Sequence, residues 1–184
     1  MFTQPIVWSL LLTLLLTAAA AICDLRTGLI PNRLVAVGAA LTLTLGFALA
    51  AEGGVSGLSG YAISALLGMV LVSIVPALLY RMGGLGGGDL KLLAVVGAAL
   101  GPYLGLEAEL YAFACVLLYA PARLLVEGKL RRAIQVCGSL MLQPFMPRKR
   151  RSKPLATQEL TEFRFGPAIF AGTLAVTVLR LSGI

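Results

Sequence analysis

Two aspartates, Asp24 and Asp89, are the residues of this 184-residue sequence best suited to do chemistry together. The other six acidic residues are glutamates, which we expect in loops, and the sequence has no histidine. Two carboxyl groups that approach closely cannot both ionise, so one stays protonated while the other acts as a general base. Such a pair can take a proton from water and polarise a peptide carbonyl. The pattern indicates hydrolysis by two carboxyl groups, with no metal and no other cofactor.

A turn follows the first aspartate. The segment Ile30-Pro31-Asn32 combines the fixed φ of proline with an asparagine side chain that bonds readily to nearby backbone. We expect Pro31 and Asn32 to support the site. The alternative interpretation is that Asp24 only caps a helix or lies in a loop, and that Pro31 and Asn32 only begin the next helix.

Five glycines precede the second aspartate within six positions: Gly83, Gly84, Gly86, Gly87 and Gly88. Each glycine weakens a helix by about 1 kcal/mol relative to alanine. We therefore expect an unwound entry in which an extended substrate can lie beside Asp89, with Gly86, Gly87 and Gly88 supporting it. A flexible loop or a close crossing of two helices would explain the glycines equally well.

The composition predicts a chain that is embedded in a lipid membrane. Hydrophobic residues make up 59% and charged residues 12% of the sequence, whereas a soluble domain has about a quarter charged residues. We expect an all-α, polytopic membrane protein of one domain, residues 1–184, with about six transmembrane helices. The predicted spans are residues 6–22, 34–50, 60–80, 91–106, 110–126 and 166–182. Residues 133–146 are too short for a span and fit an interfacial or re-entrant segment.

The basic residues predict the orientation of these spans. Fourteen of the fifteen lie in or beside the first, third and fifth connections, and Arg180 is the exception. The positive-inside rule places these connections in the cytoplasm and both termini outside. The basic segment 127–165 would then be a cytoplasmic loop with a candidate interfacial helix. Its run Arg148–Lys153 fits binding to an anionic lipid leaflet better than binding to nucleic acid.

The motifs together resemble the type IV prepilin peptidases. The resemblance rests on Asp24 with Ile30-Pro31-Asn32-Arg33, on Gly86-Gly87-Gly88-Asp89-Leu90-Lys91 and on Phe165-Gly166-Pro167-Ala168. It implies a membrane-embedded aspartic endopeptidase of the bacterial inner membrane. Such an enzyme removes the basic leader from prepilin or pseudopilin precursors at the cytoplasmic face. The resemblance also implies that Asp24 and Asp89 are the catalytic residues. Lys91 corresponds to the lysine of the family motif, as a supporting residue that either tunes Asp89 electrostatically or only extends to the membrane interface.

One feature of longer relatives is missing from this sequence. Those relatives carry a cytoplasmic domain with two C-x-x-C pairs and also methylate the new N-terminus. The three cysteines here, Cys23, Cys115 and Cys137, form no such pair. We therefore expect peptidase activity without methylation, as in the compact members of tight-adherence pilus systems.

Three other functions would fit parts of the sequence. A transporter could use the glycine stretch as a broken helix and the aspartates as cation ligands. A non-catalytic assembly subunit could bind a partner through its basic loop. An intramembrane protease of the presenilin type shares Gly-x-Gly-Asp, but it would need both aspartates well inside the spans.

Overall fold

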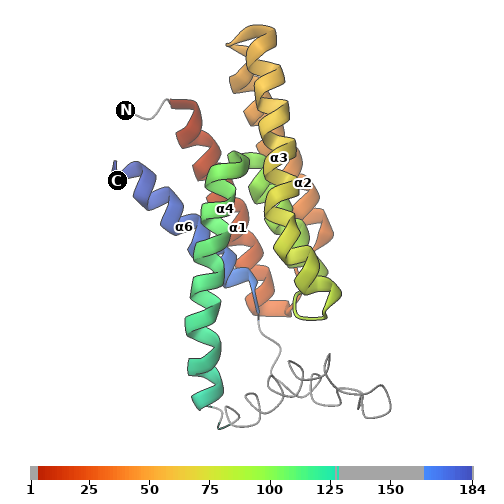
Figure 1. Cartoon of the computed structure of the whole chain (residues 1–184), viewed down its shortest axis with the longest axis vertical. Helices are drawn as coiled ribbons and strands as arrows, with labels where there is room; N and C mark the ends of the chain where they lie inside the picture. Colours follow the sequence, from red (N-terminus) through yellow and green to blue (C-terminus); the bar gives the residue numbers. More distant parts are fainter. Residues whose placement is uncertain (1–3, 127, 129–163, 184) are drawn as a thin grey trace, which may run out of the picture. The chain divides into compact units, whose positions relative to one another are not determined.

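The computed structural model describes residues 4–126, 128 and 164–183, and this part of the chain is helical with no strand. The helices are α1 (Gln4–Thr27), α2 (Asn32–Ala51), α3 (Gly54–Arg81), α4 (Gly87–Val126) and α6 (Gly166–Leu181) (Figure 1). The all-α prediction is therefore confirmed for the described residues. The chain divides into two compact units, residues 1–115 with 164–184, and residues 116–163. The described part of the second unit is the end of α4 and Gly128.

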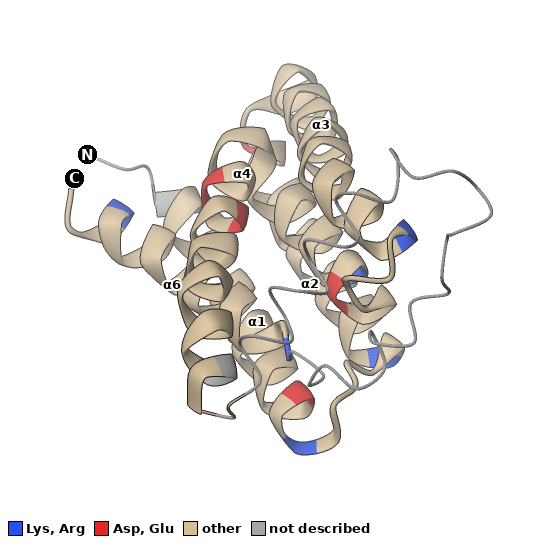
Figure 2. Cartoon of the chain, turned by 60° about the horizontal axis from the view of Figure 1, so that its bottom comes forward, with Lys and Arg blue, Asp and Glu red and all other residues tan. Residues whose placement is uncertain are grey.

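Four of these helices, α1 to α4, are long and apolar enough to cross a membrane, and α6 is a shorter apolar helix. A helix of 20 residues is about 30 Å long, which matches the hydrocarbon core of a bilayer. Charged residues are few, and the helices carry uncharged residues along most of their length (Figure 2). The chain is therefore an integral membrane protein, but the prediction of about six transmembrane spans is not confirmed.

The first three predicted spans correspond to α1, α2 and α3 in order and in position along the chain. Each observed helix is longer, and α3 begins at Gly54 rather than at residue 60. The predicted span 166–182 corresponds to α6. The segment predicted to be interfacial, residues 133–146, lies outside the described residues. So does the basic loop 127–165, except for Gly128, Arg164 and Phe165.

Helix α4 is two helices joined at a break. Gly101 has φ 78° and ψ 179°, which no helical residue adopts. A Cβ atom on Gly105 would lie 2.9 Å from the Cα atom of Gly97. Eight residues apart in a straight helix, these positions would be about 12 Å from one another. The chain therefore folds back on itself within α4, as Figure 1 shows.

This break corrects the predicted spans 91–106 and 110–126. The apolar pattern predicts the interruption around Glu107 and Glu109, but both glutamates lie within the helix that follows the break. The interruption occurs at Gly101 because glycine adopts positive φ without steric cost. Pro102 then occupies the first position of the second helix, where its missing N–H is harmless. The prediction that all six glutamates lie in loops is wrong for these two.

Small residues bring the helices into backbone contact. A Cβ atom on Gly68 of α3 would lie 2.1 Å from the carbonyl oxygen of Gly97 in α4, and one on Gly172 of α6 would lie 2.3 Å from that of Ala108. Within a membrane, helices associate through such close approaches and through side-chain hydrogen bonds. One of these bonds joins the hydroxyl groups of Thr17 in α1 and Thr173 in α6, at 2.8 Å. The packing of α6 against α1 and α4 follows from these contacts.

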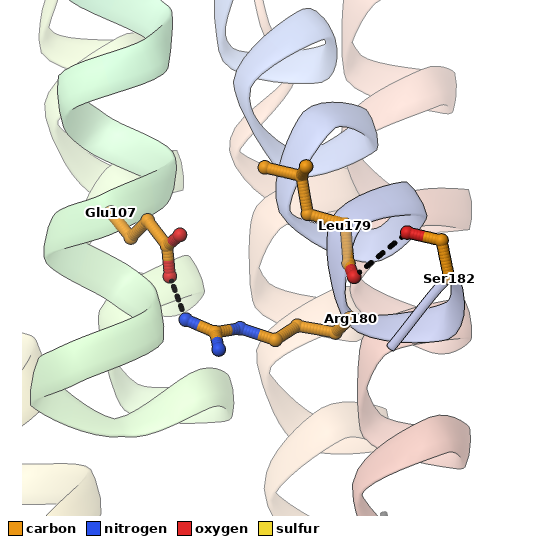
Figure 3. A network of polar contacts seen from close by, with 4 residues as sticks. All are labelled: Glu107, Leu179, Arg180 and Ser182. Carbon is orange, nitrogen blue, oxygen red and sulfur yellow. Dashed lines mark hydrogen bonds and ion pairs between the residues drawn. The ribbon is translucent and has the colours of Figure 1, made fainter. Parts of the chain in front are cut away.

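An ion pair joins the last turn of α6 to α4. Arg180 donates a hydrogen bond of 2.6 Å to the carboxylate of Glu107 (Figure 3). The guanidinium carbon also lies 5.4 Å from the ring centroid of Tyr103. Arg180 is the one basic residue that stands apart from the other fourteen in the charge count, and its charge is paired with a carboxylate.

Candidate active site

Asp24 lies in the last turn of α1 and is 4% exposed. The helix ends just beyond it, because Gly28 adopts φ 70° and donates its N–H to the carbonyl of Asp24. The Oδ2 atom of Asp24 accepts a 2.9 Å hydrogen bond from the backbone N–H of Gly166, the first residue of α6. The first N–H groups of a helix have no partner within it and carry partial positive charge. Asp24 is therefore held in place by the start of another helix.

Asp89 is the third residue of α4. Its carboxylate accepts a hydrogen bond from the backbone N–H of Gly86, the residue before the helix, which is a reach-back cap. Its Oδ1 atom is buried and has no hydrogen-bond partner among the described residues. Buried polar atoms almost always have a partner, so this oxygen calls for an explanation. A helix cap therefore explains the hydrogen bond that the Asp89 carboxylate accepts from Gly86. It does not explain the buried Oδ1 atom, which has no partner among the described residues.

The two aspartates come together although 65 positions of sequence separate them. Their carboxyl groups lie close enough for their charges to interact. The chain segments around them are also in contact, since a Cβ atom on Gly88 would lie 3.1 Å from the Cβ atom of Ile30. Figure 1 shows the end of α1 and the beginnings of α2 and α6 at the same end of the helices.

Lys91 and Asn32 form the next connection between the two motifs. The Nζ atom of Lys91 donates a 2.9 Å hydrogen bond to Oδ1 of Asn32. Pro31 precedes α2 as its N-cap residue, with φ −64° and ψ 130°. The turn after α1 and the start of α4 are thus joined by packing at Gly88 and by a hydrogen bond at Lys91.

The glycine stretch is less unwound than the sequence analysis predicts. Gly87 and Gly88 belong to the first turn of α4, and only residues 82–86 lie outside a helix. Gly83 has φ 76° and is the one glycine of the stretch whose backbone requires the left-handed region. The helix begins early because Asp89 caps it and because Gly88 packs against Ile30.

Gly166 is a site residue that the sequence analysis did not identify. The Phe-Gly-Pro motif was recognised, but nothing local in the sequence indicates that its glycine N–H binds Asp24, 142 positions away. The residues around it also contact neighbouring elements. Arg164 donates a hydrogen bond to the carbonyl of Leu25, and the rings of Phe165 and Phe113 lie 5.4 Å apart.

The donor set does not resemble a metal centre. Within residues 4–126, 128 and 164–183, no group of three or more His, Cys, Asp or Glu side chains could hold a metal ion. Cys23 and Cys115 are free thiols. What the site offers is a pair of interacting carboxyl groups, one held by a helix N-terminus and one with a free oxygen atom.

Comparison with protein families gives one match. The model of the type IV leader peptidase family matches residues 10–121, which is more than half of the chain and includes both aspartates. Gly166 lies outside the matched residues. The comparisons with curated proteins and with solved structures gave no match. The resemblance stated in the sequence analysis is confirmed, and with it an aspartic-type leader peptidase activity in the inner membrane. The chain belongs to the type IV leader peptidase family.

Proposed function

We propose that Asp24 and Asp89 are the catalytic pair of this leader peptidase, which cleaves prepilin-like precursors at the cytoplasmic face of the inner membrane. The observation that carries the proposal is that the last turn of α1 and the first turn of α4 bring the two carboxyl groups close enough for their charges to interact, with Gly88 of α4 packed on Ile30 just beyond α1. The Oδ1 atom of Asp89 supports it, because this buried atom has no hydrogen-bond partner among the described residues and can accept a hydrogen bond from a substrate or water that enters the site.

The chemistry follows from the pairing of the two groups. They share one proton, so that the ionised carboxylate takes a proton from a water molecule while the protonated carboxyl hydrogen-bonds to the scissile carbonyl. The water oxygen attacks the carbonyl carbon, and the C–N bond breaks as the nitrogen receives a proton from the pair. The pair titrates as a unit, so neither proton belongs to a named residue.

The supporting residues act by positioning. The N–H group of Gly166 holds one oxygen of Asp24, and the N–H group of Gly86 holds the carboxylate of Asp89. The bond between Lys91 and Asn32 keeps the segments that carry the two aspartates in register. Pro31 with its fixed φ sets the direction in which α2 leaves the site.

The orientation in the membrane is also part of the proposal. The break at Gly101 lets α4 supply two crossings, which with α1, α2, α3 and α6 makes six. Six crossings place both termini outside the cytoplasm and both aspartates at its inner edge, in agreement with the positive-inside rule. Arg180 is the one basic residue on the opposite side, and it is paired with Glu107. The substrates would be pilin-type precursors of a tight-adherence system, cleaved without methylation.

The test is precursor processing in membranes that contain the wild-type chain, the Asp24→Asn variant or the Asp89→Asn variant. Each substitution keeps the shape of the side chain and removes its ability to ionise. Both variants should lose processing, whereas the level of each variant in the membrane and its unfolding temperature should equal those of the wild type. Wild-type processing by either variant would end the proposal.

A further inference from the structure

A pocket of about 340 Å³ lies at the break in α4, away from the two aspartates. Helices α1, α2, α3 and α4 all line it, and none of the described lining residues is charged. Gly101 of the break is one of them, and it lies about 18 Å along the helix from Asp89. The pocket is therefore separate from the candidate active site.

Hydroxyl groups line the walls of this pocket. They belong to Ser9 of α1 and to Tyr61 and Ser64 of α3. The hydroxyl group of Tyr61 is buried and has no hydrogen-bond partner among the described residues. It lies against Gly46, another lining residue, on which a Cβ atom would be 2.0 Å from the Tyr61 hydroxyl oxygen. A buried tyrosine hydroxyl usually has a partner, and the pocket is the space beside this group from which one can come.

The break in α4 adds backbone groups to the same pocket. A Cβ atom on Gly101 would lie 2.7 Å from the Oγ atom of Ser64. Pro102 has no N–H group, so it cannot donate to the carbonyl group of Ala98 as it would in a continuous helix. Within a membrane, a broken helix is tolerated where it is buried in protein or lines a water-filled cavity, and ordered water can bind its freed backbone groups. The break and the hydroxyl groups therefore favour the same occupant.

The pocket has room for water and lies near the end of the helices. One buried water needs about 10–15 Å³, so the pocket can hold several. From Ser64 to its first residue, Gly54, α3 continues for about 15 Å. The hairpin of α2 and α3 thus reaches beyond the break in α4 (Figure 1). Ile6 lines the pocket and is 37% exposed, so the wall of the pocket reaches the surface of the molecule.

We infer that this pocket is a hydrated site, in which water binds the hydroxyl groups of Tyr61 and Ser64 and the freed backbone of the break. The pocket opens toward the end of the molecule that carries the connection between α2 and α3. Its uncharged lining suits water and small uncharged solutes that form hydrogen bonds. The site does not depend on the catalytic pair. Only the compartment that it faces rests on the proposed orientation, which places it outside the cytoplasm.

Cysteine labelling in sealed vesicles tests the hydration, in a background in which Cys23, Cys115 and Cys137 are alanine. Ser64→Cys places a thiol in the pocket. Leu66→Cys places one at nearly the same depth of α3, at a position that is 59% exposed and does not line the pocket. The thiolate is the reactive form of cysteine, and apolar surroundings disfavour it. A membrane-impermeant quaternary-ammonium methanethiosulfonate should modify Ser64→Cys on the order of tenfold faster than Leu66→Cys.

Two reference positions show from which side the reagent arrives. Glu52→Cys lies directly after α2, and Met82→Cys lies at the opposite end of α3. Ser64→Cys should be modified from the side that modifies Glu52→Cys, and modification only from the side of Met82→Cys overturns the inference. If Glu52→Cys is modified from the cytoplasmic side and Ser64→Cys follows it, the proposed orientation fails and the hydrated site is supported.

Tyr61→Phe gives a second readout that needs no reagent. Removing a hydroxyl group that binds water loses a hydrogen bond, whereas removing a buried hydroxyl group without any partner relieves a desolvation cost. Tyr61→Phe should therefore lower the unfolding temperature. An unchanged or higher unfolding temperature indicates a dry pocket and overturns the inference. Equal rates of modification for Ser64→Cys and Leu66→Cys overturn it as well.

Discussion

Gly166 is the position where the smallest substitution should disturb Asp24 most directly. A Cβ atom there would lie 2.8 Å from both the Cβ and the Oδ2 atoms of Asp24 and 3.1 Å from its Cγ atom. Carbon atoms pack at about 3.5–4.0 Å, so Gly166→Ala requires a shift of roughly 0.7–1.2 Å. The variant keeps the N–H group that binds Asp24. It therefore tests the position of the carboxylate, with the hydrogen-bond donor still present.

A shift of this size matters more for catalysis than for folding. A displacement of about 1 Å in a reacting group can lower a rate on the order of 10²-fold, whereas one extra methyl group in a packed site costs about 1–3 kcal/mol of stability. We expect kcat for precursor processing to fall on the order of 10²-fold in Gly166→Ala, with most of the protein still folded.

The assay compares processing with heat unfolding in the same membranes. Gly60→Ala is the matched control, because a Cβ atom on Gly60 meets no atom within 4 Å and its helix tolerates alanine. That variant should process at the wild-type rate and gain up to about 1 kcal/mol of stability. A wild-type rate for folded Gly166→Ala would refute the reasoning. A loss of rate no larger than the loss of folded protein would refute it equally.

Three further predictions concern packing, charge and metals. Gly68→Ala should destabilise the fold by about 3 kcal/mol or prevent folding, because its Cβ would meet the backbone oxygen of Gly97 at 2.1 Å; wild-type heat unfolding would contradict this. A double-mutant cycle with Arg180→Met and Glu107→Gln should give a coupling of about 0.5–1 kcal/mol, since both side chains are partly exposed, and processing should continue. Chelators should leave processing unchanged, because the sequence has no histidine; a loss of activity that added metal restores would count against the carboxyl-pair mechanism.

The pair of aspartates was predictable because of its context in the sequence. Asp24 and Asp89 are the only aspartates, and each lies where an apolar run meets a polar turn. Their approach depends on tertiary packing, but the positions of the basic residues predict that both turns lie on the same side of the membrane. The positions of the basic residues therefore predict that the two side chains lie at one edge of the membrane, but they do not predict the packing by which the side chains approach each other.

The break within α4 was misplaced for an identifiable reason. Glu107 and Glu109 look like a polar connection because charged residues seldom occur inside a membrane span. In the structure, the charge of Glu107 is paired with Arg180, which lies 73 positions further along. Gly101-Pro102 is the true interruption, and this dipeptide is a recognised turn signal. The bond between Glu107 and Arg180 explains why Glu107 can lie inside a helix. The sequence around Glu107 does not contain this information, because Arg180 is far away along the chain.

The position of Asp24 depends on a helix that lies beyond the residues matched by the family model. Helix α6 binds α1 through Asp24 and Gly166 at its first turn and through Thr17 and Thr173 further along. Its last turn is joined to α4 by Arg180. A hydrogen bond to a charged group contributes about 1.5–3 kcal/mol, and its loss would leave a buried carboxylate with an unpaired oxygen. The carboxyl group on α1 is thus oriented from outside its own helix, so the geometry of the pair depends on how the whole set of helices packs.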